Sequence, residues 1–236
     1  MKLSRALFTI ATVAIFTIFA GCDSQGVGSD DTGRVTLSIM AVNAGSAAKG
    51  GNSAAVVDAA KILLRTIQFH ARDLDEETEG VEFRSATMVA ELNLDASPLM
   101  LAVADIPFGT YHKVSFRIHK PDDGEMPPDP DFKIGESGNE RFSVIVDGKL
   151  DGIPFQYRSS KSMQQKVDFE SELVIEEITA DMNVTLLVNV STWFKDDDGN
   201  ELDPTDDTSS NESMIDKSIR ESFRIFKDNN RDGQPD

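Results

Sequence analysis

Short runs in which apolar and polar residues alternate recur along the chain and predict a protein built mainly from strands. Residues 113–119 read Lys-Val-Ser-Phe-Arg-Ile-His, which has the two-residue period of a strand with one buried face. Residues 120–131 hold four prolines and are expected to be irregular, because proline lacks a backbone donor. The pattern predicts further strands at residues 34–42, 59–72, 81–94, 98–103, 141–147, 152–158, 166–176 and 182–194.

One stretch is ambiguous between helix and strand, and another is predicted to be a helix. Residues 55–70 contain alanine and leucine, which suit a helix, but the alternation from Lys61 to His70 favours a strand. Residues 211–227 are predicted to be a helix, since Ser209 and Glu212 match a capping box. The helix would present an apolar stripe at spacings of three and four residues, made of Met214, Ile215, Ile219, Phe223 and Phe226.

Many strands and one late helix indicate a mainly β fold, an antiparallel β-sandwich with a C-terminal amphipathic helix. We expect residues 34–194 to form the sandwich. Residues 195–236 would follow as an acidic loop, the helix and an Asp-rich tail.

The N-terminus has the features of a secretory signal peptide, predicted over residues 1–21. Lys2 and Arg5 precede an uncharged run from Ala6 to Phe19, and two small residues follow. This apolar run is shorter than the roughly 20 residues that a membrane-spanning helix needs.

Cys22 is the predicted lipidation site. Phe19-Ala20-Gly21-Cys22 resembles the bacterial lipobox, although Phe19 stands where leucine is usual. Cys22 is the only cysteine, so an intramolecular disulfide is excluded and acylation would remove a free thiol. The alternative is an ordinary signal peptide that happens to carry a cysteine. Residues 22–33 would form a flexible acidic tether, and Asp23 leaves the choice of inner or outer membrane open.

The balance of charge limits the partners. The formal net charge is −18, and the signal peptide carries basic residues only, so the mature chain is more acidic still. Nucleic acid and anionic lipid surfaces both favour basic proteins, so neither is expected as a partner. The expected membrane contact is the lipid anchor on Cys22.

Three segments resemble a known group of proteins. They are Ile106-Pro107-Phe108-Gly109-Thr110-Tyr111, the Thr192-Trp193-Phe194 segment with its following Asp-Gly and Asp-Pro pairs, and the Ser222-Phe223 segment that runs into residues 228–236. In this order they resemble an uncharacterised group of bacterial envelope lipoproteins with a transthyretin-like or immunoglobulin-like β-sandwich domain. The resemblance implies a fold and a location in the cell envelope, periplasmic or surface-exposed. It implies no activity.

The tail is a candidate calcium site. Asp228, Asn230, Asp232 and Gly233 match the start of an EF-hand-type loop, and Asp236 supplies a further oxygen. Oxygens at alternate positions converge on a hard cation, and glycine permits the sharp turn. The chain ends before the bidentate glutamate of such loops, so the expected affinity is weak, and a solvated acidic tail is the alternative.

Other candidates have simpler structural explanations. The loop from Asp196 to Glu201 contains an Asp-Gly pair typical of a hairpin turn, with metal binding as the less favoured interpretation. His70, His112 and His119 are not expected to form a zinc site. An aromatic sugar platform is less favoured than a place in the core for Trp193, Phe194, Tyr111 and Tyr157.

The sequence therefore favours a non-enzymatic envelope lipoprotein, a β module for binding or scaffolding that calcium stabilises at the tail. A glycan and an envelope protein are both open as its ligand. A structural or adhesion component of the envelope is the alternative. A glycan-processing hydrolase is the least favoured. No G-x-S-x-G motif of a serine nucleophile is present, and the many Asp and Glu residues single out no catalytic carboxylate pair.

Overall fold

The computed structural model describes residues 31–43, 55–72, 80–179 and 181–236. Residues 31–236 form one compact unit. The predicted signal peptide, Cys22 and most of the predicted tether lie outside the described residues, as do most of the loop after residue 43 and the charged tip at 73–79.

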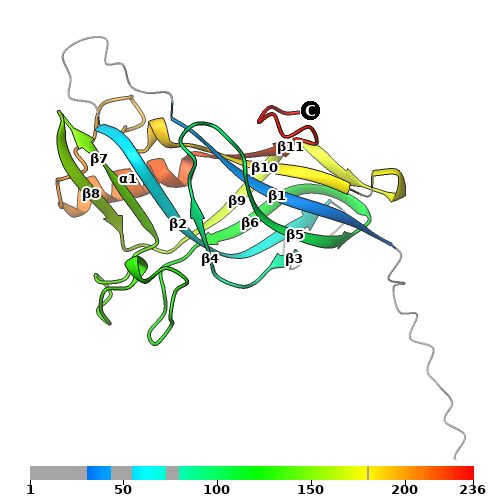
Figure 1. The fold of residues 1–236 in the computed structure, drawn as a ribbon, viewed down its shortest axis with the longest axis horizontal. Coiled ribbons are helices and arrows are strands. Elements are labelled where there is room, and N and C mark those ends of the chain that lie inside the picture. Colours follow the sequence, from blue (N-terminus) through cyan, green and yellow to red (C-terminus); the bar gives the residue numbers. More distant parts are fainter. Residues whose placement is uncertain (1–30, 44–54, 73–79, 180) are drawn as a thin grey trace, which may run out of the picture. The chain divides into compact units, whose positions relative to one another are not determined.

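The described part is mainly β, as the alternating pattern predicts (Figure 1). The strands are β1 (Thr32–Val42), β2 (Ala55–Ala71), β3 (Val81–Arg84), β4 (Met88–Glu91), β5 (Leu99–Pro107), β6 (Gly109–Ile118), β7 (Val144–Leu150), β8 (Ile153–Ser159), β9 (Met163–Ile175), β10 (Asp181–Asn189) and β11 (Phe223–Lys227). Short 3-10 turns occur at η1 (Pro130–Phe132), η2 (Glu177–Thr179) and η3 (Val190–Thr192). The ambiguous stretch from residue 55 is a strand.

The strands form one curled, mixed sheet in the order β5-β1-β10-β11-β9-β6-β2-β7-β8, with β3 and β4 paired to β2. The prediction of a purely antiparallel sheet is wrong, because β1 pairs with β10 in parallel and β11 pairs with β9 in parallel. A parallel pair needs a long connection between its strands. The chain forms eight strands, β2 to β9, between β1 and β10, and local periodicity does not reveal this arrangement.

Two halves of the sheet enclose a common core. One half consists of β5, β1, β10 and β11, and the other of the remaining strands. A single register pair, Ile225 of β11 with Phe169 of β9, joins the two halves. Buried side chains from both halves belong to the same cluster, including Leu37, Val184 and Phe116. Phe69 of β2 lies 6.0 Å from the ring of Phe169. The sheet thus encloses its core as a half-barrel.

The C-terminal segment departs most from the sequence-based prediction. The helix α1 spans Ser209–Glu221 and then ends, so the predicted helix over 211–227 is wrong for residues 222–227. Phe223–Lys227 instead form β11, which pairs with β10 in antiparallel register. The N-cap of α1 is Thr208, whose side chain forms no capping hydrogen bond, so the predicted capping box of Ser209 and Glu212 is also wrong. Tertiary pairing overrides the local helical spacing here, because β11 fills the gap between β10 and β9.

No helix in the part of the chain that the structure describes is both long and apolar enough to cross a membrane.

Candidate functional site

A long loop between β6 and β7, residues 119–143, carries a network of polar contacts. A small second core fixes it, in which Phe132 and Phe142 of the loop pack against Leu63 and Ile145. The strand β2 places this loop, because its first part pairs with β7 and its second part with β6. The loop therefore crosses the point at which β6 and β7 diverge.

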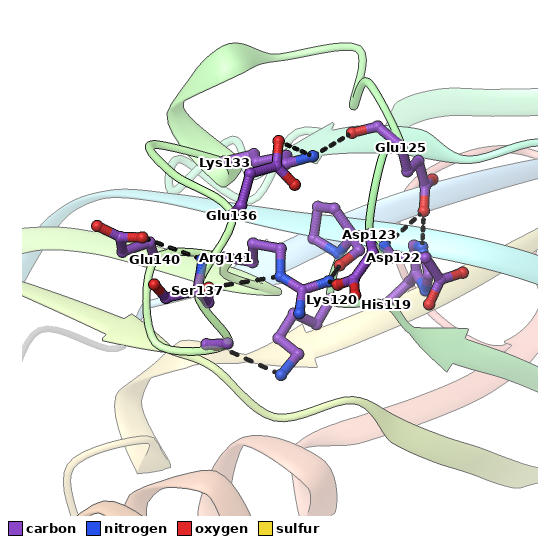
Figure 2. Close-up of polar contacts among 12 residues, drawn as sticks. His119, Lys120, Asp122, Asp123, Glu125, Lys133, Glu136, Ser137, Glu140 and Arg141 are labelled. Atoms are coloured by element: carbon purple, nitrogen blue, oxygen red, sulfur yellow. Dashed lines mark hydrogen bonds and ion pairs between the residues drawn. The ribbon is translucent and has the colours of Figure 1, made fainter.

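Three side chains of this loop converge. One ligand atom from each of His119, Asp122 and Glu125 lies within 4.8 Å of the others. The Nε2 atom of His119 is 2.7 Å from Oε2 of Glu125 (Figure 2). A tight turn brings them together, since the amide of Glu125 donates to the carbonyl of Asp122 at 3.1 Å. Gly124 permits this turn with a φ of 73°.

Arg65 of β2 already places a cation within this group. Its Nη1 atom is 3.2 Å from Oδ2 of Asp122, 3.4 Å from Nε2 of His119 and 3.8 Å from Oε2 of Glu125. The guanidinium is permanently charged. It therefore offsets part of the negative charge that a bound metal ion would otherwise offset.

Glu125 is held as a carboxylate. Its burial alone would raise the pKa, but donors from the Asp122 amide, His119 and Thr87 outweigh that effect and lower the pKa of Glu125. The Thr87 hydroxyl donates to Oε1 at 3.0 Å, and the Asp122 amide donates to Oε2 at 2.9 Å. Glu125 therefore links the loop to the segment between β3 and β4.

The tautomer of His119 decides whether the group suits a metal. The side chain of His119 is 1% exposed, and its Nδ1 atom has no hydrogen-bond partner. Nε2 faces the carboxylate of Glu125, so we assign the proton to Nε2. A metal on Nε2 would move that proton to Nδ1, where a buried N–H without an acceptor is costly. The residues His119, Asp122, Glu125 and Arg65 therefore fit a hydrogen-bonded cluster better than a metal site. We call this cluster the clasp.

Further ion pairs secure the rest of the loop. Lys61 of β2 binds Asp129 at 2.7 Å and Asp131 at 3.3 Å. Arg141 binds Asp123 at 2.6 Å, and Lys133 donates to the carbonyl of Glu125 at 3.1 Å (Figure 2). With the clasp, these contacts hold the loop against β2.

The predicted calcium residues lie at the other end of the unit, after β11. Asp228 is fully buried, and its Oδ2 atom accepts from the Thr185 hydroxyl at 2.7 Å and from the Gly233 amide at 3.2 Å. Its Oδ1 atom accepts from the Asp232 amide at 3.0 Å. Asp228 thus organises the loop, because its carboxylate accepts hydrogen bonds from the amides of Asp232 and Gly233.

The other predicted ligands fold around this aspartate. The Asn230 amide group donates to Oδ2 of Asp232 at 2.9 Å, and Oδ2 of Asp236 accepts from the Asn229 amide at 2.8 Å. Asp228, Asn230 and Asp232 are close in the chain. The carboxylate oxygens of Asp228, Asp232 and Asp236, however, do not converge as the ligand atoms of His119, Asp122 and Glu125 do. Hydrogen bonds satisfy the loop in the present arrangement.

The loop of Asp196 is a turn. The Asp196 carboxylate accepts from the amides of Asp198 at 3.0 Å and Asn200 at 2.8 Å. Gly199 has a φ of 81°, and an antiparallel bridge joins Lys195 to Glu201. Hydrogen bonds from Asn200, first from its side chain, lower the pKa of Asp196. The simpler hairpin interpretation fits this geometry.

The aromatic residues behave as the sequence predicts. Trp193, Phe194, Tyr111 and Tyr157 are at most 5% exposed, so their assignment to the core is confirmed. Among the residues that the structure describes, the large exposed hydrophobic side chains are aliphatic or methionine. A sugar platform made of these four aromatic residues is therefore excluded.

The histidines do not gather into one site. His119 lies in the clasp, whereas His70 contacts the Ser115 hydroxyl at 2.8 Å, and burial followed by the charge of Lys113 lowers the pKa of His70. Sequence reasoning missed the clasp. The H-x-x-D-x-x-E spacing from His119 to Glu125 was the available local signal, but Arg65 and Thr87 have no signal of this kind.

Comparisons with known proteins place the chain in no established family. No protein-family model matches it, and no curated protein matches it. Among solved structures, MbnP from Methylosinus trichosporium is similar with a TM-score of 0.42 and 10% sequence identity. The match covers 83% of this chain and 98% of MbnP.

Proposed function

We propose that the protein is a lipid-anchored module of the bacterial cell envelope that binds or scaffolds another envelope component and carries out no reaction. The observation that carries the proposal is the position of Cys22, the only cysteine, after a signal-type segment and shortly before the compact unit that begins at Asp31. Such an order suits a domain held at a membrane by acyl chains on its first residue.

The number of residues between anchor and unit limits where the module works. Asp31 is nine positions after Cys22, and an extended chain spans at most about 3.6 Å per residue. The start of the unit would therefore lie within roughly 30 Å of the membrane surface. A module this close to the membrane suits a partner that is itself in, or at, the same membrane.

Metabolic labelling tests the anchor. The full chain would be produced in a bacterium fed an alkyne analogue of palmitate, beside a Cys22→Ser variant and a Phe19→Leu variant. We expect label on the wild type and on Phe19→Leu, which restores the usual lipobox leucine, and none on Cys22→Ser. Equal labelling of Cys22→Ser, or an unlabelled wild type, would refute lipidation at Cys22.

The enclosed core supports a relation to transthyretin-like or immunoglobulin-like sandwich lipoproteins. The two halves of the sheet bury one cluster between them, as the two layers of a sandwich do. The parallel pairs β1–β10 and β11–β9 distinguish this chain from a simple antiparallel sandwich. We therefore propose the family relation on the basis of the packing and the three sequence segments.

We also propose that calcium stabilises the tail loop. The buried Asp228 carboxylate and the positive φ of Gly233 at 79° support the proposal, since both agree with an EF-hand-type start. Calorimetric titration of the full chain with calcium tests it, with Asp232→Asn and Asn230→Ala as variants and Asp207→Asn as an exposed acidic control. We expect saturable heat that the first two variants weaken and the control preserves. Absence of heat at millimolar calcium would refute the site.

A further inference from the structure

The outer face of the sheet carries a cleft of about 450 Å³ beside the tail. This volume falls in the range of small-molecule sites. Strands β1, β5 and β10 form its floor, and the tail after β11 forms one wall. The cleft therefore brings together segments from the beginning, middle and end of the unit.

Two arginines line this cleft without a partner. The side chains of Arg34 and Arg231 are exposed, and neither forms an ion pair or hydrogen bond with a residue that the structure describes. Acidic residues outnumber basic ones 41 to 23 in this chain, so carboxylate partners are abundant. Two unpaired guanidinium groups on one cleft are available to an oxyanion, which they bind with paired N–H donors.

The tail fixes the backbone of one arginine and places a further donor beside it. Arg231 has a φ of 59°, and its amide donates to the carbonyl of Asp228 at 3.2 Å. Oδ1 of Asn229 accepts from the Asn183 amide at 3.1 Å, which orients the Asn229 side-chain amide group. Because the Asn229 carboxamide oxygen is used in this way, its NH₂ group is left as a donor at the cleft.

The other lining residues limit the ligand. Met100 is 61% exposed and Val103 is 39% exposed, so apolar surface faces the solvent beside the arginines. Asp181 also lines the cleft and is in register with Arg34. A carboxylate here, on a chain of net charge −18, disfavours polyanions and suits a ligand with a single anionic group.

We propose that this cleft binds a small amphiphile, in which one phosphate or carboxylate group meets Arg34 and Arg231 and a short apolar part rests on Met100 and Val103. The inference rests on the proposal that the unit is a binding module and names the ligand class. The anionic group belongs either to a free molecule or to a phospholipid headgroup, since Arg34 is twelve positions after the proposed anchor Cys22.

Calorimetry on the full chain in phosphatidylcholine nanodiscs tests the ligand class. The probes are hexyl phosphate, inorganic phosphate, which lacks the chain, and hexanol, which lacks the charge. We expect saturable binding of hexyl phosphate that is tighter than that of either control. No binding of hexyl phosphate, or equal binding of a control probe, would overturn the proposal.

Variants locate the site. Arg34→Gln and Arg231→Gln are each expected to weaken hexyl phosphate binding about tenfold, equivalent to about 1.4 kcal/mol. Arg117→Gln, an exposed arginine away from the cleft, is the matched control and should leave binding unchanged. Met100→Gln should weaken hexyl phosphate binding and leave that of inorganic phosphate unaltered. Wild-type affinity in both cleft arginine variants would place the ligand elsewhere and refute the proposal.

Nanodiscs that contain phosphatidylglycerol distinguish the two sources of the anion. Weaker apparent binding of hexyl phosphate in these discs indicates that the headgroup occupies the cleft, and unchanged binding indicates a free ligand. Both results support the oxyanion site. Palmitate labelling at Cys22 is measured separately, so failure of the cleft and failure of the anchor are distinguishable.

Discussion

The hydroxyl of Tyr157 on β8 donates to Oδ1 of Asp216 on helix α1 across 3.0 Å, and both side chains are buried. This bond is a polar contact through which α1 packs on the edge of the sheet. Burial raises the pKa of Asp216, although hydrogen bonds from Ser159 and Tyr157 oppose the rise. Burial and then the charge of Asp216 also raise the pKa of Tyr157, which keeps its hydroxyl protonated as a donor.

We expect Asp216→Asn to stabilise the protein at neutral pH. The raised pKa means that the folded state binds the Asp216 proton more tightly than the unfolded state, so this residue's contribution is fully present below the unfolded pKa. It is lost as pH rises through the folded pKa. Asparagine keeps the acceptor for Tyr157 and carries no charge. The melting temperature at pH 7.5 should rise by about 2–4 °C for each 1 kcal/mol gained.

A pH series checks this prediction. The advantage of Asp216→Asn in thermal melting should grow as pH rises above about 4, the ordinary pKa of an aspartate, and shrink in more acid solution. Tyr157→Phe should destabilise by about 1–3 kcal/mol, because it leaves the buried carboxylate with one donor fewer. An Asp216→Asn variant that is less stable than wild type at pH 7.5 would show that the charge itself holds the helix.

Asp228 should be essential to the closure of the tail. In Asp228→Asn an NH₂ group replaces an oxygen that accepts a hydrogen bond, either from Thr185 and the Gly233 amide or from the Asp232 amide. Unpaired buried donors cost about 1–3 kcal/mol each, so we expect a loss of about 2–3 kcal/mol in urea unfolding. Asp232→Asn, which is exposed, should change stability by less than about 0.5 kcal/mol in the absence of calcium. Equal losses would contradict the central role of Asp228.

Two glycines with similar backbone angles should respond differently to alanine. Gly233 and Gly199 have φ values of 79° and 81°, so both substitutions carry backbone strain of about 1 kcal/mol. A Cβ at Gly233 would also overlap the sulfur of Met40, whereas a Cβ at Gly199 meets nothing within 4 Å. Gly233→Ala should therefore lower the free energy of unfolding by more than Gly199→Ala. Met40→Ala should recover part of the difference in the double variant.

The clasp of Glu125 should control local opening of the loop at 119–143. Glu125→Ala removes the acceptor for His119, Thr87 and the Asp122 amide, and we expect a loss of about 1–3 kcal/mol. Amide hydrogen exchange in the loop should rise, while exchange in β10 should stay slow. Glu136→Ala is the control, because the Glu136 side chain is 74% exposed and such pairs contribute little. Similar exchange in both variants would refute the clasp.

The positive charge of Arg65 should oppose the binding of a metal ion to the clasp, and this can be tested. Removing the guanidinium in Arg65→Met takes away the cation that faces Asp122 and Glu125. We expect Co²⁺ to bind more tightly to Arg65→Met than to wild type, as measured by visible absorption. Equal affinity in the two proteins would show that Arg65 does not compete with a metal.

Local patterns predicted the strands well. Alternation at 113–119 marks most of β6, and the prolines of 120–131 mark the irregular loop that follows it. The same reasoning failed at Phe223, where a helical spacing of apolar residues coincides with the alternation of a short strand. Five residues are too few to distinguish the period of a helix from that of a strand. Pairing with β10 and β9 therefore determines that this segment is a strand.

The candidate sites divide in the same way. The Asp228 loop is contiguous in the chain, so its motif is visible in the sequence, whereas Arg65 reaches His119 across 54 positions and Arg34 shares a cleft with Arg231 from the opposite end of the unit. By itself the sequence determined the strand-rich composition and the tail motif, and it is the basis of the proposed anchor, because each depends on residues close together in the chain. Only the tertiary structure decided the mixed strand order, the clasp and the cleft, because sheet pairing brings distant residues into contact without leaving a local period.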